Sequence, residues 1–154
     1  MIGYRIASVL SLNPDLYSHV RGIYSIDTLP KKLHNLDYAI FNISKSCETG
    51  RHWVCLHKTL DSNLEILDPL PSEFAQKRFQ EYLHYFETEC EINSVNLQRR
   101  NSDSCGPMVI FYCYSRFMNE DLFFEDYLNL YFSKSVTMNE SIVKEYLDEL
   151  QASK

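Results

Sequence analysis

Apolar residues form three short runs, each flanked by polar positions, in the first half of the chain. Residues 37–43, 52–58 and 64–68 are rich in β-branched and aromatic side chains and are bounded by turn-forming residues. They therefore predict three strands of an antiparallel meander. The stretch LDSN, which contains Asp61, is typical of a hairpin turn between two of these strands. A further strand is expected over about 92–98.

Apolar residues recur at helical spacing through most of the remaining chain. This spacing predicts helices at residues 4–12, 71–88, 105–118, 120–132 and 138–151. Thr137 and Glu140 predict a capping box at the start of the last helix. The apolar stripe of that helix is expected to pack in the core and consists of Ile142, Val143, Tyr146, Leu147 and Leu150. The order of elements predicts an α+β fold with a helix packed on a mixed or mainly antiparallel sheet.

Length and composition fit a single domain spanning residues 1–154. Hydrophobic residues make up 45% of the chain and glycines number only four, which argues against disorder. No stretch approaches the roughly 20 apolar residues of a membrane span, and the N-terminus does not resemble a signal peptide. Five irregularly spaced cysteines indicate free thiols in a reducing compartment. We therefore expect a monomer that is neither secreted nor membrane-bound.

A candidate nucleophile stands in the segment QRRNSDSCG, which an apolar stretch suited to a buried helix follows at once. Cys105 would begin that helix, where the partial positive charge of the helix end favours the nucleophilic thiolate. Pro107 is compatible with this placement because amide nitrogens in the first turn have no intrahelical partner. The other cysteines in apolar runs are expected to be core residues, and these are Cys55, Cys90 and Cys113.

A nucleophilic cysteine needs a base, and the base needs an acid that orients it. His52 opens one predicted strand and Asp68 closes the next, so they are the candidate base and acid. His57 is the alternative base, although its odd offset from His52 puts it on the opposite face of the strand. Asp61 is the alternative acid, although it falls in the predicted hairpin turn.

Gln98 lies seven positions before Cys105 and carries an amide donor suited to an oxyanion. With the backbone amide of Cys105 it would form an oxyanion hole with two donors. Spacing alone equally allows an ordinary polar residue at the end of a strand.

Four potential metal ligands cluster in the sequence, and these are Cys47, His52, Cys55 and His57. No C-x-x-C pair or second ligand pair accompanies them, and His52 and Cys55 would point to opposite faces of a strand. No metal and no other required cofactor is therefore expected.

The blocks that contain these residues resemble those of the adenovirus protease (adenain) group and, more distantly, the Ulp-type SUMO proteases of the same clan. The resemblance covers about residues 20–118 and rests on RGIYSIDTLP, DYAIFNISKSCETGRHWVCLH, EILDPL and QRRNSDSCG. The chain differs from the family in Pro107, which replaces the usual apolar residue after Cys-Gly, and in being shorter than adenovirus enzymes. A Polinton-type element or an adenovirus-like or virophage-like virus would fit as its source, as would an adenovirus proper.

The resemblance implies a papain-like cysteine protease. Its chemistry would be carried by His52, Asp68, Gln98 and Cys105. Its substrate cleft would include Asn42, Trp53 and Gly106, and Gly50 from the adjoining loop. A tryptophan on a central strand is more often a core residue, and Trp53 could serve in both places. The implied reaction is cleavage of viral or element-encoded precursors, such as capsid or scaffold proteins, next to glycine. The protein would act in the cytoplasm or nucleus of a host cell or in the virion.

Two activators known in the adenovirus group fit this chain differently. An activating peptide could pair through a disulfide with a spare cysteine, Cys47 or Cys90. DNA activation is less compatible, because a net charge of −6 and a pI near 5.3 do not suit counterion release from DNA. The net charge does not exclude a local basic strip that binds DNA. The short basic groups in the sequence are Arg99 with Arg100 and Lys31 with Lys32.

Two rival functions are compatible with the same residues. A deubiquitinase or SUMO-type isopeptidase would share all four site residues and act on ubiquitin-like proteins. A binding module with a degenerate site would not react at Cys105. The presence of the complete set of four argues against the second alternative.

Overall fold

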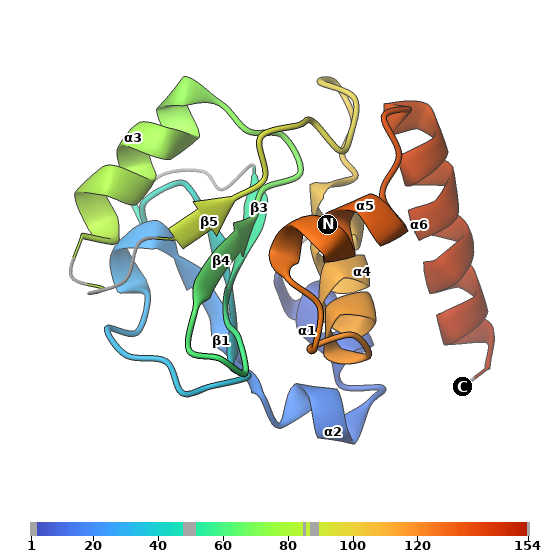
Figure 1. The fold of residues 1–154 in the computed structure, drawn as a ribbon, viewed down its shortest axis with the longest axis horizontal. Helices are drawn as coiled ribbons and strands as arrows, with labels where there is room; N and C mark the ends of the chain where they lie inside the picture. The colour runs from blue at the N-terminus through green and yellow to red at the C-terminus, as the bar shows by residue number, and fades with distance from the viewer. Residues whose placement is uncertain (1–2, 48–51, 85, 87–89, 154) are drawn as a thin grey trace.

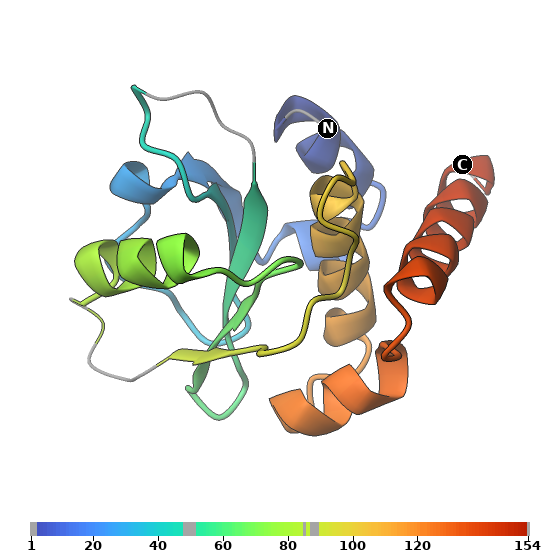
Figure 2. The ribbon, with the colours of Figure 1, turned by 90° about the horizontal axis from the view of Figure 1, so that it is seen from above.

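The computed structural model describes residues 3–47, 52–84, 86 and 90–153, and it has an α+β fold. A five-stranded sheet lies between helices on its two faces (Figure 1). Seen from above, α4 lies between the sheet and α6 (Figure 2). The helix that begins at Cys105 is thus the central element of one of the two helical layers.

The sheet is mixed, with its strands in the order of the chain. The strands are β1 (Val20–Ser25), β2 (Tyr38–Asn42), β3 (Trp53–Lys58), β4 (Leu64–Leu67) and β5 (Cys90–Ile92). The predicted meander is confirmed, because β2, β3 and β4 pair antiparallel. Of the two sheet types expected, the structure has the mixed one and not a mainly antiparallel one, because β1 pairs parallel to β2 and β5 pairs parallel to β4.

The two edge strands also differ from the sequence prediction in extent. β1 was not expected as a strand, and its register shifts between Val20 and Gly22, where Gly22 has a φ of +150° that favours glycine. β5 is only three residues long, so the predicted strand over 92–98 is wrong beyond Ile92. Gln98 instead lies in a loop, where its backbone amide donates to the carbonyl of Pro69 over 3.3 Å.

The helices occur largely where the apolar spacing predicts them. They are α1 (Gly3–Leu10), α2 (Pro14–Tyr17), α3 (Glu73–Tyr82), α4 (Cys105–Phe117), α5 (Phe124–Tyr131) and α6 (Val136–Ala152), with a 3-10 turn η1 (Ile26–Thr28). The short α2 was not predicted, although the Asn13 side chain caps it and Pro14 occupies its first turn. The predicted capping box at Thr137 is wrong, because Ser135 caps α6.

Side chains alternate between two hydrophobic cores, one on each face of the sheet. Tyr38 and Ile40 of β2 face the core shared with α1, α4 and α6, whereas Ala39 and Phe41 face the core beneath α3. The predicted stripe of α6 packs as expected at Val143 and Leu147, which are buried. Ile142, by contrast, is exposed.

Helix α4 contacts α1, α6 and β3, so it is enclosed on several sides. This explains why its sequence is apolar almost throughout rather than along one stripe. Cys55 and Cys113 are fully buried in this core, as predicted, whereas Cys90 is only partly buried. The start of α4 is therefore held firmly by packing, which makes it a rigid support for Cys105.

Candidate active site

Three elements bring the candidate site residues to one end of the sheet. His52 immediately precedes β3, Asp68 immediately follows β4, and Cys105 is the first residue of α4. Because β3 and β4 are antiparallel, the start of one lies beside the end of the other. The carbonyl of His52 accepts a hydrogen bond from Ile43 over 3.2 Å, which fixes the backbone at the histidine.

His52 and Asp68 form a close pair. Nε2 of His52 is 2.6 Å from Oδ1 of Asp68, and the Asp68 side chain is 1% exposed. A neutral imidazole that donates from Nε2 carries its lone pair on Nδ1, the nitrogen that is left to act on Cys105. Asp68 thus holds the tautomer that a base toward the cysteine requires.

Asp68 is itself held by an asparagine that the sequence did not single out. Oδ1 of Asn93 accepts from the Asp68 amide over 2.7 Å, and Nδ2 of Asn93 donates to the Asp68 carbonyl over 2.7 Å. The same Nδ2 donates to Val95 over 3.1 Å. The buried Asn93 side chain therefore joins the end of β4 to the segment that leads to Gln98, replacing the hydrogen bonds that a longer β5 would have made.

The electrostatics of the pair favour a charged imidazole next to a thiolate. Burial opposes the charge of His52, but hydrogen bonds with Asp68 and Cys105 outweigh it and raise the pKa of His52 to about 9. Burial raises the pKa of Cys105, but the hydrogen bond with His52 and the backbone amides of Trp53 and Gly106 lower it below its usual range. Cys105 thus differs from Cys90, whose pKa burial raises to about 11.

Gln98 lies in the loop that leads to Cys105 and is 3% exposed. Its Nε2 donates to the Ser102 carbonyl over 3.2 Å, while its Oε1 has no hydrogen-bond partner among the described residues. A primary amide has two N–H groups, so the contact with Ser102 leaves one donor for another acceptor.

A cavity of about 660 Å³ opens at these residues. It is lined by Ile43, His52, Leu70, Pro71, Ser72, Glu73, Asn96, Gln98, Arg100, Ser102 and Cys105. The base, the nucleophile and the amide donor therefore face one space, large enough for several residues of a peptide. Asp68 is not among the lining residues, in keeping with its position behind the imidazole.

The residues expected in a substrate cleft lie in different places. Gly106 is buried in the first turn of α4, next to Cys105. Asn42 is buried at the end of β2 and accepts from Ser44, and Trp53 packs against the core on the α4 side of the sheet. Neither Asn42 nor Trp53 lines the cavity at Cys105. Gly50 lies outside the described residues.

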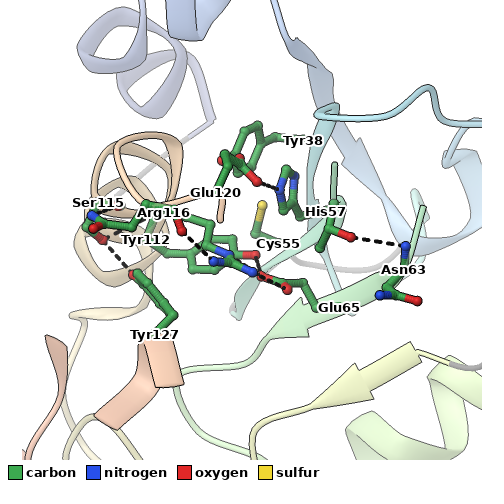
Figure 3. Close-up of polar contacts among 12 residues, drawn as sticks. Tyr38, Cys55, His57, Asn63, Glu65, Tyr112, Ser115, Arg116, Glu120 and Tyr127 are labelled. Carbon is green, nitrogen blue, oxygen red and sulfur yellow. Dashed lines mark hydrogen bonds and ion pairs between the residues drawn. The ribbon is translucent and has the colours of Figure 1, made fainter. Parts of the chain in front are cut away.

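The alternatives to the site residues are separated from Cys105. His57 is fully buried, and its Nδ1 is 2.9 Å from the carbonyl of Asp37. Its Nε2 is 2.9 Å from the carboxylate of Glu120 (Figure 3). Asp61 lies in the turn before β4, as predicted. Both residues are therefore placed away from the candidate nucleophile.

The potential metal ligands noted in the sequence do not converge. Cys47 is exposed, Cys55 and His57 are in the core, and His52 faces the cavity. Within the described residues, no group of three or more histidine, cysteine or acidic side chains is arranged to hold a metal ion.

No helix among the described residues is both long and apolar enough to cross a membrane.

Comparisons with known proteins leave the family open. No family model and no curated protein matches the chain. One similar solved structure is the central domain of an uncharacterized protein, Lpg1148, from Legionella pneumophila. It is 13% identical, the match covers 97% of this chain and 98% of that one, and the TM-score is 0.45. A likeness at this level carries no argument about fold family or function.

Proposed function

We propose that the protein is a cysteine endopeptidase of the adenain type with a papain-like fold. The observation that carries the proposal is the arrangement of His52, whose Nε2 is 2.6 Å from buried Asp68 while its ring also bonds Cys105. A buried acid, an imidazole and a cysteine at a helix N-terminus are the parts that nucleophilic acyl transfer requires.

The proposed reaction begins with attack of the Cys105 thiolate on the scissile carbonyl. The side-chain amide of Gln98 and the backbone amide of Cys105 donate to the oxyanion that forms. His52 passes its proton to the departing amine, leaving a thioester on Cys105. It then takes a proton from water as the water attacks the thioester, which releases the acid product and restores the Cys105 thiolate beside a protonated His52.

The sequence resemblance extends the proposal to the substrate. We expect cleavage of viral or element-encoded precursor proteins next to glycine, in the host cell or the virion. A deubiquitinase or SUMO-type isopeptidase remains the second candidate, because the same four residues would serve it. Fluorogenic ubiquitin-like substrates, compared with glycine-containing peptides, separate the two.

The first test is alkylation with iodoacetamide between pH 5 and 9, with the modified cysteine located by mass spectrometry. In the wild type we expect Cys105 to react selectively well below the pH at which Cys47 reacts, because its thiolate is stabilised. His52→Ala should abolish the difference. Cys47, the exposed cysteine, is the internal control in each sample.

The second test is hydrolysis of glycine-containing peptides and precursor proteins by the wild type and by Cys105→Ala. Loss of turnover in a variant that keeps the wild-type circular dichroism supports the proposal. Retained turnover in Cys105→Ala would overturn the mechanism. Slow, uniform labelling of all accessible cysteines in the wild type would instead favour a binding module.

A further inference from the structure

The loop between Gln98 and Cys105 is attached to α6 by a single carboxylate. Oε1 of Glu140 accepts from Nε and from the backbone amide of Arg99, over 2.6 and 3.3 Å. Oε2 accepts from the Ser104 hydroxyl over 2.6 Å and from the Ser102 hydroxyl. The Glu140 side chain is only 9% exposed. Four donors from one loop thus converge on one nearly buried acid from a distant helix.

The charge of this carboxylate is stabilised by the loop. Burial raises the pKa of Glu140, but hydrogen bonds from Ser102, Ser104 and Arg99 outweigh it and lower the pKa below its usual range. Hydrogen bonds to a charged acceptor are about twice as strong as neutral ones. The contact is therefore stronger than an ordinary surface ion pair.

The loop has little apolar packing, because cavities border it on two sides and residues 99–101 and 103 are exposed. Ser102 lines the cavity of about 660 Å³ at Cys105. Arg99 and Ser104 line a second cavity, of about 520 Å³, whose opposite wall is α6. Figure 1 shows this loop and the beginning of α6 at the same end of the molecule. Hydrogen bonds within the loop, and the four that it donates to Glu140, therefore hold it in place rather than apolar packing.

The position of the loop determines the direction of the Gln98 amide. The carbonyl of Ser102 accepts from Nε2 of Gln98 over 3.2 Å, and Oε1 of Gln98 has no partner among the described residues. The contact with Ser102 is thus what sets the rotation of the amide about its last bond. A displaced Ser102 would turn the second N–H away from the space beside Cys105.

We infer that Glu140 is a positioning residue for the oxyanion hole, acting on Gln98 through the hydroxyl and carbonyl of Ser102. This inference rests on the proposed function, because it assigns a role in that reaction. It also gives α6 a part in the active site, although no residue of α6 lines the cavity at Cys105.

The test compares Glu140→Ala, Glu140→Gln and Ser102→Ala with the control Glu149→Gln, which changes an exposed acid on the same helix. We expect kcat to fall by about 10²-fold in Glu140→Ala, near the lower end for loss of an oxyanion donor. Smaller losses are expected in the other two site variants, with KM nearly unchanged. Iodoacetamide labelling of Cys105 should keep its wild-type rate, because the thiolate depends on His52.

A double-mutant cycle with Gln98→Ala gives the sharpest result. If Glu140 acts through Gln98, Glu140→Ala should add little to the loss of kcat in a chain that already carries Gln98→Ala. Losses that multiply would overturn the inference, as would wild-type kcat in Glu140→Ala. A loss of kcat in all three site variants that merely follows a fall in melting temperature would also overturn it.

The experiment separates this inference from the proposed function. Selective labelling and turnover in the wild type, with normal kcat in the Glu140 variants, would contradict only the role of Glu140. Absence of selective labelling and of turnover in the wild type would overturn both.

Discussion

Two polar clusters occupy opposite ends of the same three elements, β3, β4 and α4. At one end, His52 pairs with Asp68 beside Cys105 and faces a cavity. At the other, His57 pairs with Glu120 and stacks on Tyr38 with ring centroids 3.9 Å apart, inside the core (Figure 3). Both clusters contain a histidine bonded to a carboxylate, so the pair itself does not distinguish them.

The two histidines differ in the partners of their ring nitrogens and in whether a substrate can reach them. His57 is 0% exposed and both of its ring nitrogens have protein partners, so no position remains for a substrate. His52 uses one nitrogen for Asp68 and the other is left for Cys105. A network sealed in the core stabilises the fold, whereas one whose histidine and cysteine line a cavity can perform chemistry.

The second cluster continues into a buried ion pair. Arg116 of α4 donates to both oxygens of Glu65 on β4, over 2.9 and 3.0 Å, and Tyr112 also donates to Glu65 (Figure 3). The Arg116 and Glu65 side chains are 1% and 3% exposed. This end of α4 is thus joined to the sheet by charge and hydrogen bonds, while the other end presents Cys105.

The largest expected effect comes from replacing each of the two histidines with alanine in turn. His52→Ala should lower peptide turnover by about 10⁴-fold or more, as loss of a triad base does elsewhere, and selective labelling of Cys105 should be lost with it. His57→Ala should lower the melting temperature while Cys105 still labels selectively at neutral pH. An equal loss of Cys105 labelling in a folded His57→Ala variant would contradict the distinction between the clusters.

The next largest effect concerns stability. Arg116→Leu should lower the free energy of unfolding by about 3–5 kcal/mol, because it leaves the buried Glu65 carboxylate without its charged partner. Urea denaturation followed by circular dichroism measures the change. Lys144→Ala is the control, since it breaks an ion pair whose side chains are 79% and 64% exposed and should have little effect. Similar losses in both variants would argue against a structural role specific to the buried pair.

A smaller effect on stability should accompany an effect on the site. Asn93→Ala leaves the amide and carbonyl of Asp68 without partners, which should cost about 1–3 kcal/mol of unfolding free energy. It should also lower kcat, because Asp68 is no longer held against His52. Asn35→Ala removes an exposed asparagine that donates to the Leu60 carbonyl and serves as the control. Loss of stability with unchanged kcat would show that the Asn93 contacts support only the fold.

The smallest effect is a shift in pH dependence. Wild-type hydrolysis should fall as pH rises through about 9, because His52 then loses the proton that the leaving amine requires. Asp68→Asn removes the negative charge that stabilises the imidazolium, so the Cys105 labelling curve should move up by about one pH unit, or about 1.4 kcal/mol. An unshifted labelling curve in a folded variant would mean that Asp68 does not tune the pair.

Local patterns predicted the central part of the fold well. Residues of β2, β3 and β4 alternate between the two cores, and α4 and α6 carry apolar residues suited to their surroundings. The edges of the sheet were harder to predict, because β1 pairs parallel to β2 and β5 pairs parallel to β4. Long connections, rather than tight turns, join the strands of each parallel pair. Glycine in β1 and the brevity of β5 weaken the local signal further.

His52, Asp68 and Cys105 could be proposed from the sequence because each stands at the boundary of a strand or helix. Gln98 lies in a loop and was proposed only from its spacing to Cys105 and from the family resemblance. The sequence alone determined which side chains could supply a nucleophile, a base, an acid and an amide donor. Only the tertiary structure decided that His57 is sealed while His52 is not, and that Asn93 and Glu140 hold the site. Asn93 acts 25 positions from Asp68 and Glu140 acts 38 positions from Ser102, so packing, rather than local pattern, selects these contacts.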